Sequence, residues 1–206
     1  MNRAYLAGIL LATLAWSSVA QEKAPGRPDF NGIYPEMTRA DFDALYPVFA
    51  KGCRKMPTGR VYCMYFGTSS EMAKEIGIPA SWIGAEPNLN TFAGEPVESA
   101  FVTLDPSSEK IFTLSFELYT RSFDIVGRAL TKRFGKPHTR TSRIRDRTGA
   151  EFDQVQMRWT IGSTIVECEK RSGSMDMMKV SMVSRAAMAI IEKEIKAMEA
   201  KGAKDR

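Results

Sequence analysis

Residues 110–119 alternate apolar and polar side chains along their length. Every second position carries a large apolar residue and polar residues stand between them: Phe112, Leu114, Phe116 and Leu118 against Thr113, Ser115 and Glu117. A period of two gives a strand with one apolar and one wet side, which is typical of an antiparallel sheet packed on one face. Related patterns bounded by turn residues predict further strands at 97–104, 139–145, 152–161, 164–171 and 177–184.

Helical periodicity replaces this alternation in three segments. Residues 123–134 begin after a candidate N-cap, Ser122, and end at Gly135. A short helix is expected after Thr38, and a C-terminal helix over 185–201 has the apolar stripe Ala187, Ile190, Ile191, Ile195 and Met198. The chain is therefore predicted to be α+β, with mostly antiparallel sheet or sheets covered by two or three helices.

The first twenty residues have the features of a cleavable export signal. Arg3 precedes an eleven-residue apolar run, 6–16, and small residues stand at Ser18 and Ala20. The run is too short to cross a bilayer, which takes about 20 apolar residues. We predict cleavage after Ala20, a periplasmic or secreted location, and a mature chain with no transmembrane segment.

The remaining chain divides into a leader, one domain and a short tail. Residues 21–36 are rich in Pro and Gly and are interpreted as a flexible leader, and 202–206 as a frayed tail. Between them, 37–201 form a single predicted α+β domain. A short helix followed by antiparallel strands occurs twice in it, so two half-modules, 37–119 and 120–201, are a second interpretation.

Cys53 and Cys63 flank a Pro-Thr-Gly turn signal at 57–59. With the turn centred on Thr58, the two cysteines stand directly opposite each other in a hairpin, at a spacing that a disulfide accepts. Exported proteins meet oxidants, so a disulfide between them is favoured among the three possible pairings. It would stabilise the fold by roughly 2.5 to 3 kcal/mol. Cys168 is then expected to be a buried free thiol.

Two segments of the second half, "ALTKRFGKP" (129–137) and "VQMRWTIGSTIVE" (155–167), resemble small secreted proteins of Gram-negative envelopes. Those proteins have a helix that ends in a Lys-aromatic-Gly-x-Pro segment, followed by a Trp-bearing strand pair. The resemblance covers the second half of the mature chain only. It implies a periplasmic envelope protein with an α+β fold and transfers no catalytic residue.

Positive charge is concentrated between residues 132 and 147. Seven Lys or Arg stand there against Asp146, a local net charge of +6, whereas the whole chain carries +5. Guanidinium groups clustered on a strand pair suit carboxylate or phosphate recognition. Because alternate residues share a strand face, Arg143, Arg145 and Arg147 are expected together, with Arg158 joining them from the partner strand. The candidate binding residues are Lys136, Arg140, Arg143, Arg145, Arg147 and Arg158.

Other reactive residues have simpler interpretations. Met175, Met177, Met178 and Met182 are soft ligands in type, but neighbours on a strand point to opposite faces, so core packing is favoured over Cu(I) binding. His138 is the one histidine and is interpreted as a surface residue. Trp82, in a loop, is expected to plug the edge of the core or to grip a ligand. No metal or cofactor site is predicted.

These observations predict an exported, non-catalytic binding or interaction module of the cell envelope. An envelope protein or an anionic component such as a lipid headgroup, a lipopolysaccharide phosphate or a wall polymer is the expected partner. Nucleic acid is excluded by location, and the oligomeric state stays open. The alternative is a small periplasmic hydrolase with its site in the loop-rich residues 67–96.

Overall fold

The computed structural model describes residues 28–57, 59–68, 70–75 and 77–204, without the side chains of Met72, Ile195 and 197–204. The predicted signal peptide and the first part of the predicted leader, 21–27, lie outside these residues. Within the described part, no helix has the length and apolar character that crossing a membrane requires.

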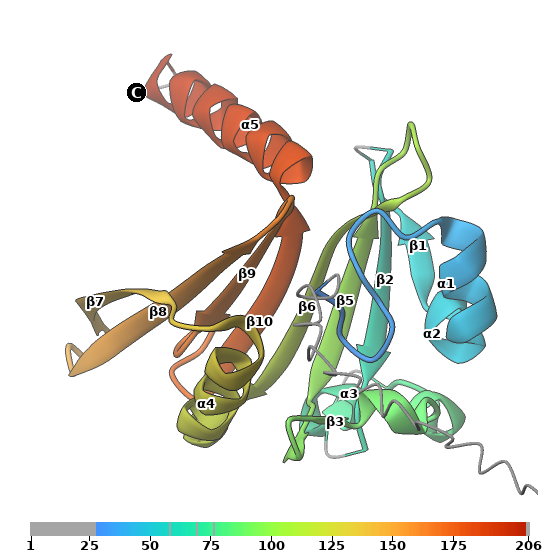
Figure 1. Ribbon diagram of the computed structural model, residues 1–206, viewed down its shortest axis with the longest axis horizontal. Coiled ribbons are helices and arrows are strands. Elements are labelled where there is room, and N and C mark those ends of the chain that lie inside the picture. Colours follow the sequence, from blue (N-terminus) through green and yellow to red (C-terminus); the bar gives the residue numbers. More distant parts are fainter. Residues whose placement is uncertain (1–27, 58, 69, 76, 205–206) are drawn as a thin grey trace, which may run out of the picture.

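An eight-stranded antiparallel sheet forms the body of the protein (Figure 1). In spatial order its strands are β1 (Cys53–Lys55), β2 (Val61–Phe66), β5 (Ser99–Leu104), β6 (Ile111–Tyr119), β10 (Met177–Ser184), β9 (Thr164–Glu169), β8 (Glu151–Ile161) and β7 (His138–Arg145). A separate two-stranded ribbon pairs β3 (Thr91–Phe92) with β4 (Glu95–Pro96). The predicted antiparallel sheet is confirmed.

Helices precede and follow these strands, which makes the protein α+β as expected. They are α1 (Arg39–Leu45), α2 (Pro47–Lys51), α3 (Glu71–Glu75), α4 (Phe123–Phe134) and α5 (Arg185–Lys204), with 3₁₀ turns at Ala80–Trp82, Pro87–Leu89 and Thr120–Ser122. Thr38 caps α1, because its hydroxyl accepts the Asp41 N–H at 3.2 Å.

The strand order is symmetric about the middle of the sheet. Helices α1 and α2 lead into the strands β1, β2, β5 and β6, and α4 leads into β7, β8, β9 and β10. In each set, every strand pairs with the next one of that set along the chain. The last strands of the two sets, β6 and β10, pair with each other at the centre of the sheet. One continuous sheet therefore joins the two halves of the chain.

The hydrophobic core lies on one face of this sheet. Across the central pair it is built from residues at most 1% exposed: Leu114, Phe116 and Leu118 on β6 and Met178, Val180 and Met182 on β10. Phe49 of α2 packs on Tyr65 of β2, with ring centroids 5.6 Å apart. On the other half, the indole of Trp159 donates to the carbonyl of Gly135, at the end of α4, at 2.7 Å.

The predicted flexible leader is wrong for residues 28–36. Phe30 and Ile33 are fully buried, and the Phe30 ring meets Phe92 and Phe116 edge-on at 4.6 and 5.2 Å. The two buried residues face each other in an isolated β-bridge around a turn. Pro and Gly in this stretch indicate an irregular backbone, which need not be a flexible one. A segment with an irregular backbone can still place apolar side chains in the core.

The C-terminal helix also differs from expectation. Its first two turns pack Ala187, Met188 and Ile191 against Phe112 and Val183 of the sheet. Ile190 is 44% exposed, so the predicted stripe does not form one buried face, and α5 leaves the sheet at the end of β10 (Figure 1). The helix also runs to Lys204, into the part predicted to be a frayed tail.

Candidate functional site

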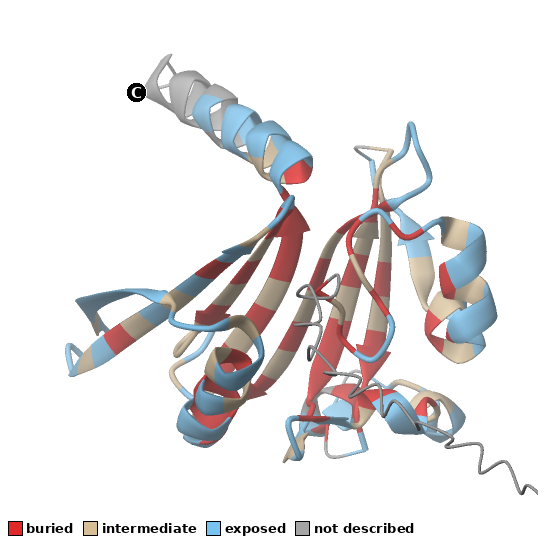
Figure 2. Cartoon of the chain, viewed as in Figure 1, coloured by how far each residue is buried: buried red, intermediate tan, exposed pale blue. Residues whose placement is uncertain are grey.

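We call the sheet face opposite the core the open face. Figure 2 shows buried and partly buried residues alternating along β6 and β10. The side chains of the partly buried residues lie on the open face. The strand registers align its side chains in two rows that cross β6, β10, β9, β8 and β7. These rows are Ser115, Ser181, Glu167, Arg158 and His138, and Glu117, Lys179, Glu169, Gln156 and Arg140.

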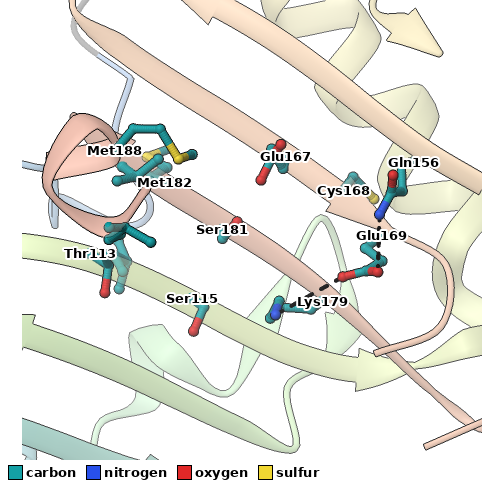
Figure 3. A pocket seen from close by; sticks show the side chains of 13 residues that line it. Thr113, Ser115, Gln156, Glu167, Cys168, Glu169, Lys179, Ser181, Met182 and Met188 are labelled. Carbon is teal, nitrogen blue, oxygen red and sulfur yellow. Dashed lines mark hydrogen bonds and ion pairs between the residues drawn. The ribbon is translucent and has the colours of Figure 1, made fainter. Parts of the chain in front are cut away.

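A hollow of about 380 Å³ lies on the centre of the open face (Figure 3). Hydroxyls of Ser115 and Ser181 stand between the charged residues on one side and α5 on the other. Figure 3 shows Glu169 between Lys179, at 4.0 Å, and the amide of Gln156, at 3.2 Å. The hollow thus offers hydrogen-bonding and charged groups to a ligand, with α5 as an apolar rim.

A second hollow of about 220 Å³ continues toward the edge of the sheet. It is lined by His138, Arg140, Gln156, Arg158 and Glu167, two of which also line the first hollow. Arg158 forms an ion pair with Glu167 at 2.6 Å. Arg140 is exposed, and it forms no ion pair within the described part of the chain.

The predicted arginine cluster is divided between two faces. Arg143 and Arg145 lie on the core side of the sheet, where Arg145 binds Glu151 at 2.6 Å and Arg143 binds Glu151 at 3.2 Å and approaches Asp153 at 3.8 Å. The expectation that Arg158 joins them is wrong. Arg143 pairs with Asp153 of β8, so the odd-numbered residues of β8 lie on the same face as Arg143. Because successive residues of a strand point to opposite faces, the even-numbered Arg158 points to the open face.

The remaining predicted basic residues lie outside the strands. Lys136 is exposed in the connection from α4 to β7, and Arg147 is exposed in the turn between β7 and β8. That turn is fixed by Asp146, whose carboxylate accepts from the Thr148 hydroxyl at 2.7 Å and from the Ala150 N–H at 2.9 Å. These hydrogen bonds hold the pKa of Asp146 below its usual value. Arg147 therefore projects from an ordered turn.

The cysteines behave as expected. Cys53 and Cys63 form a disulfide between directly opposed positions of β1 and β2, in the register that the turn signal predicts. Cys168 is a free, fully buried thiol. Burial raises its pKa to about 12, with a smaller contribution from Glu169, so it is an unreactive core residue at neutral pH.

The other singled-out residues are also dispersed. Met178 and Met182 are fully buried in the core, whereas Met177 is partly exposed on the other face. His138 is on the surface, as expected. Among the described residues, no group of three or more His, Cys, Asp or Glu could hold a metal ion.

The stretch 67–96, proposed as a hydrolase site, packs beside α2. Its buried carboxylate, Glu86, accepts the N–H groups of Val48 and Phe49 at 2.7 and 3.2 Å, which makes it a cap for the first turn of α2. Trp82 is partly buried and lines a separate cavity with residues of α2 and β2.

Searches against protein-family models, curated proteins and solved structures found no match for this chain. The resemblance to small envelope proteins therefore stays a prediction, and the geometry of the open face is the basis for a functional proposal.

Sequence reasoning missed most of the open-face rows. The alternation of Glu167 and Glu169 with Val166 and Cys168 could have identified the polar side of β9. The pairing of β6 with β10, which brings Ser115 beside Ser181, has no local signal, since the two strands are some sixty residues apart in sequence.

Proposed function

We propose that this protein is an exported, non-catalytic binding module of the cell envelope, and that it recognises anionic groups of a ligand or partner on the open face of β7 and β8. The disulfide between Cys53 and Cys63 supports an oxidising compartment. The periplasm or the cell exterior, to which the N-terminal sequence points, is such a compartment.

The proposal rests on the exposed guanidinium of Arg140 and its lack of a carboxylate partner in the described part of the chain. Its guanidinium is exposed beside a hollow and has no carboxylate partner among the described residues, whereas Arg143, Arg145 and Arg158 each have one. A planar guanidinium can form two parallel hydrogen bonds to a carboxylate or phosphate. Arg158 lies on the row next to that of Arg140 and is paired with Glu167 of its own row. It provides a second positive charge close to Arg140.

The surroundings favour binding over hydrolysis. The side chains of the two hollows form cross-strand pairs with each other, and His138 is exposed at the rim. In the alternative region, 67–96, the buried carboxylate of Glu86 is already bound by two backbone N–H groups. We therefore retain the binding module as the function that the geometry supports best.

A paired substitution tests the surface. Replacing Arg140 and Arg158 by Gln is expected to lower the salt concentration at which the protein elutes from heparin, and to weaken its binding to vesicles that contain anionic lipid. The control is Arg143→Gln with Arg145→Gln, which removes the same charge from the opposite face. Those two side chains lie away from the open face beside Glu151 and Asp153, whereas Arg140 has no carboxylate partner among the described residues, so the control should elute close to the wild type.

Equal losses in both double variants would show that net charge alone drives retention and would overturn the assignment to the open face. Unchanged elution of the Arg140 and Arg158 variant would overturn it as well. Thermal unfolding of each variant checks that the fold is retained.

A further inference from the structure

The cavity that Trp82 lines has a volume of about 260 Å³ and lies at the opposite edge of the sheet from β7 and β8. It forms beside the short strand β1, between α2, the outer edge of β2 and the 3₁₀ turn that carries Trp82. Its volume is slightly below the range of roughly 300 to 1,000 Å³ that is usual for small-molecule sites, which limits it to a small ligand. It is separate from the hollows of the open face and lies outside the proposed anion-binding surface.

The walls of this cavity are dominated by aromatic rings. Those of Phe49, Tyr65 and Phe66 belong to residues that are at most 4% exposed, and Tyr62 and Trp82 add two partly buried rings. Aromatic walls favour a flat, apolar ligand, which can pack against ring faces and edges.

Two of the walls, Phe49 and Tyr65, are held in place by hydrogen bonds within the protein. The Tyr65 hydroxyl donates to Oδ1 of Asn90 at 2.8 Å and also lies 3.1 Å from the carbonyl of Glu86. The Glu86 carboxylate in turn holds the first turn of α2, which carries Phe49. Binding of a ligand would therefore cost little free energy for ordering these two walls.

One charged side chain, Arg54, is among the described residues that line the cavity. Its Nη1 donates to the carbonyls of Lys51 and Cys53 at 3.0 and 2.8 Å, and the adjacent disulfide fixes the backbone at Cys53. Within the described part of the chain, Nε and Nη2 have no acceptor. The guanidinium is thus oriented by one nitrogen and keeps N–H donors for an anion.

We propose that this cavity is a binding site for a small aromatic carboxylate. The ring system would fill the space between Phe49, Trp82 and Tyr62, and the carboxylate would accept hydrogen bonds from Nε and Nη2 of Arg54. No covalent step is involved.

The test uses 2-naphthoate as the probe and 2-naphthylmethanol as its neutral counterpart. In a chain that begins at Gln21, the only tryptophans are Trp82 and Trp159, so each gives its own indole N–H signal in an NMR titration. We expect 2-naphthoate to shift the Trp82 signal and to leave that of Trp159, which is bonded to Gly135, in place. Replacing Arg54 by Gln should weaken 2-naphthoate about tenfold, the effect of losing hydrogen bonds to a charged group, and leave 2-naphthylmethanol unchanged.

Two further variants complete the design. Trp82→Ala should weaken both probes; because this variant lacks the reporter signal, its affinities are measured by isothermal titration calorimetry beside those of the wild type. An unchanged Trp159 signal would show that the variant is folded. Arg140→Gln should leave both affinities unchanged, which separates this site from the proposed anion surface.

The proposal is overturned if the Trp82 signal does not move at millimolar 2-naphthoate. It is also overturned if both probes bind equally and Arg54→Gln changes neither, since the cavity would then not select a carboxylate.

Discussion

At the scale of single residues, alternation along a strand decides what a side chain can do. Arg143 and Arg145 face two acidic residues, whereas Arg140 and Arg158 face the open side, although all four come from one hairpin. The composition of the segment predicts a basic surface but not its division, because the register of β7 on β8 settles which residues share a face.

Cys168 carries a prediction of pH dependence. Burial raises its pKa from 9.0 to about 12, so the folded protein keeps the thiol proton over a pH range in which the unfolded chain loses it. The free energy of unfolding should therefore fall as pH rises above about 9, at up to about 1.4 kcal/mol per pH unit from this one group. Urea unfolding at about pH 8 and about pH 10 should show a steeper loss for the wild type than for Cys168→Ala.

The wild type has to be compared with Cys168→Ala because Tyr46, Tyr62 and Tyr65 also lower the free energy of unfolding as the pH rises. Burial raises the pKa of each of them to about 12, so both proteins should lose stability in alkali. An identical loss in wild type and variant would show that Cys168 contributes nothing.

At the scale of elements, the hairpin of β1 and β2 is short and depends on its covalent link. Strand β1 has three residues and lies at the edge of the sheet, pairing only with β2 in the described structure. The disulfide joins its first residue to the centre of β2, next to Arg54 and the aromatic cavity. The bridge therefore supports both the fold and the proposed ligand site.

Removing this bridge should have a defined cost. The double variant Cys53→Ala with Cys63→Ala should lower the free energy of unfolding by roughly 2.5 to 3 kcal/mol, the entropy of closing an eleven-residue loop in the unfolded chain. Urea unfolding without reductant provides the measurement. A wild type treated with reductant should match the variant, and a loss well below about 1 kcal/mol would contradict the loop-closure argument.

At the scale of the whole molecule, the central pairing of β6 with β10 makes the two halves interdependent. The six central core residues of this pair are all at most 1% exposed, so separating the halves would expose apolar surface on both. This continuity favours cooperative unfolding of the described domain as one unit.

Each half carries one tryptophan outside the predicted signal peptide, which makes this cooperativity measurable. Trp82 reports on the first half and Trp159 on the second. In Trp159→Phe and Trp82→Phe variants, urea transitions followed by fluorescence should each coincide with the transition of the same variant followed by circular dichroism. A Trp signal that changes at a clearly lower urea concentration than the backbone signal would show that its half unfolds independently.

The sequence by itself determined the features that depend on neighbouring residues. Alternation located the strands from 97 onward, Ser122 and Gly135 bounded α4, and the turn at 57–59 placed Cys53 opposite Cys63. Each follows from backbone geometry within a few residues. Only the tertiary structure decided that Phe30 enters the core, that β6 pairs with β10 and that α5 leaves the sheet. These depend on contacts between residues far apart in the chain, whose partners a local pattern does not specify.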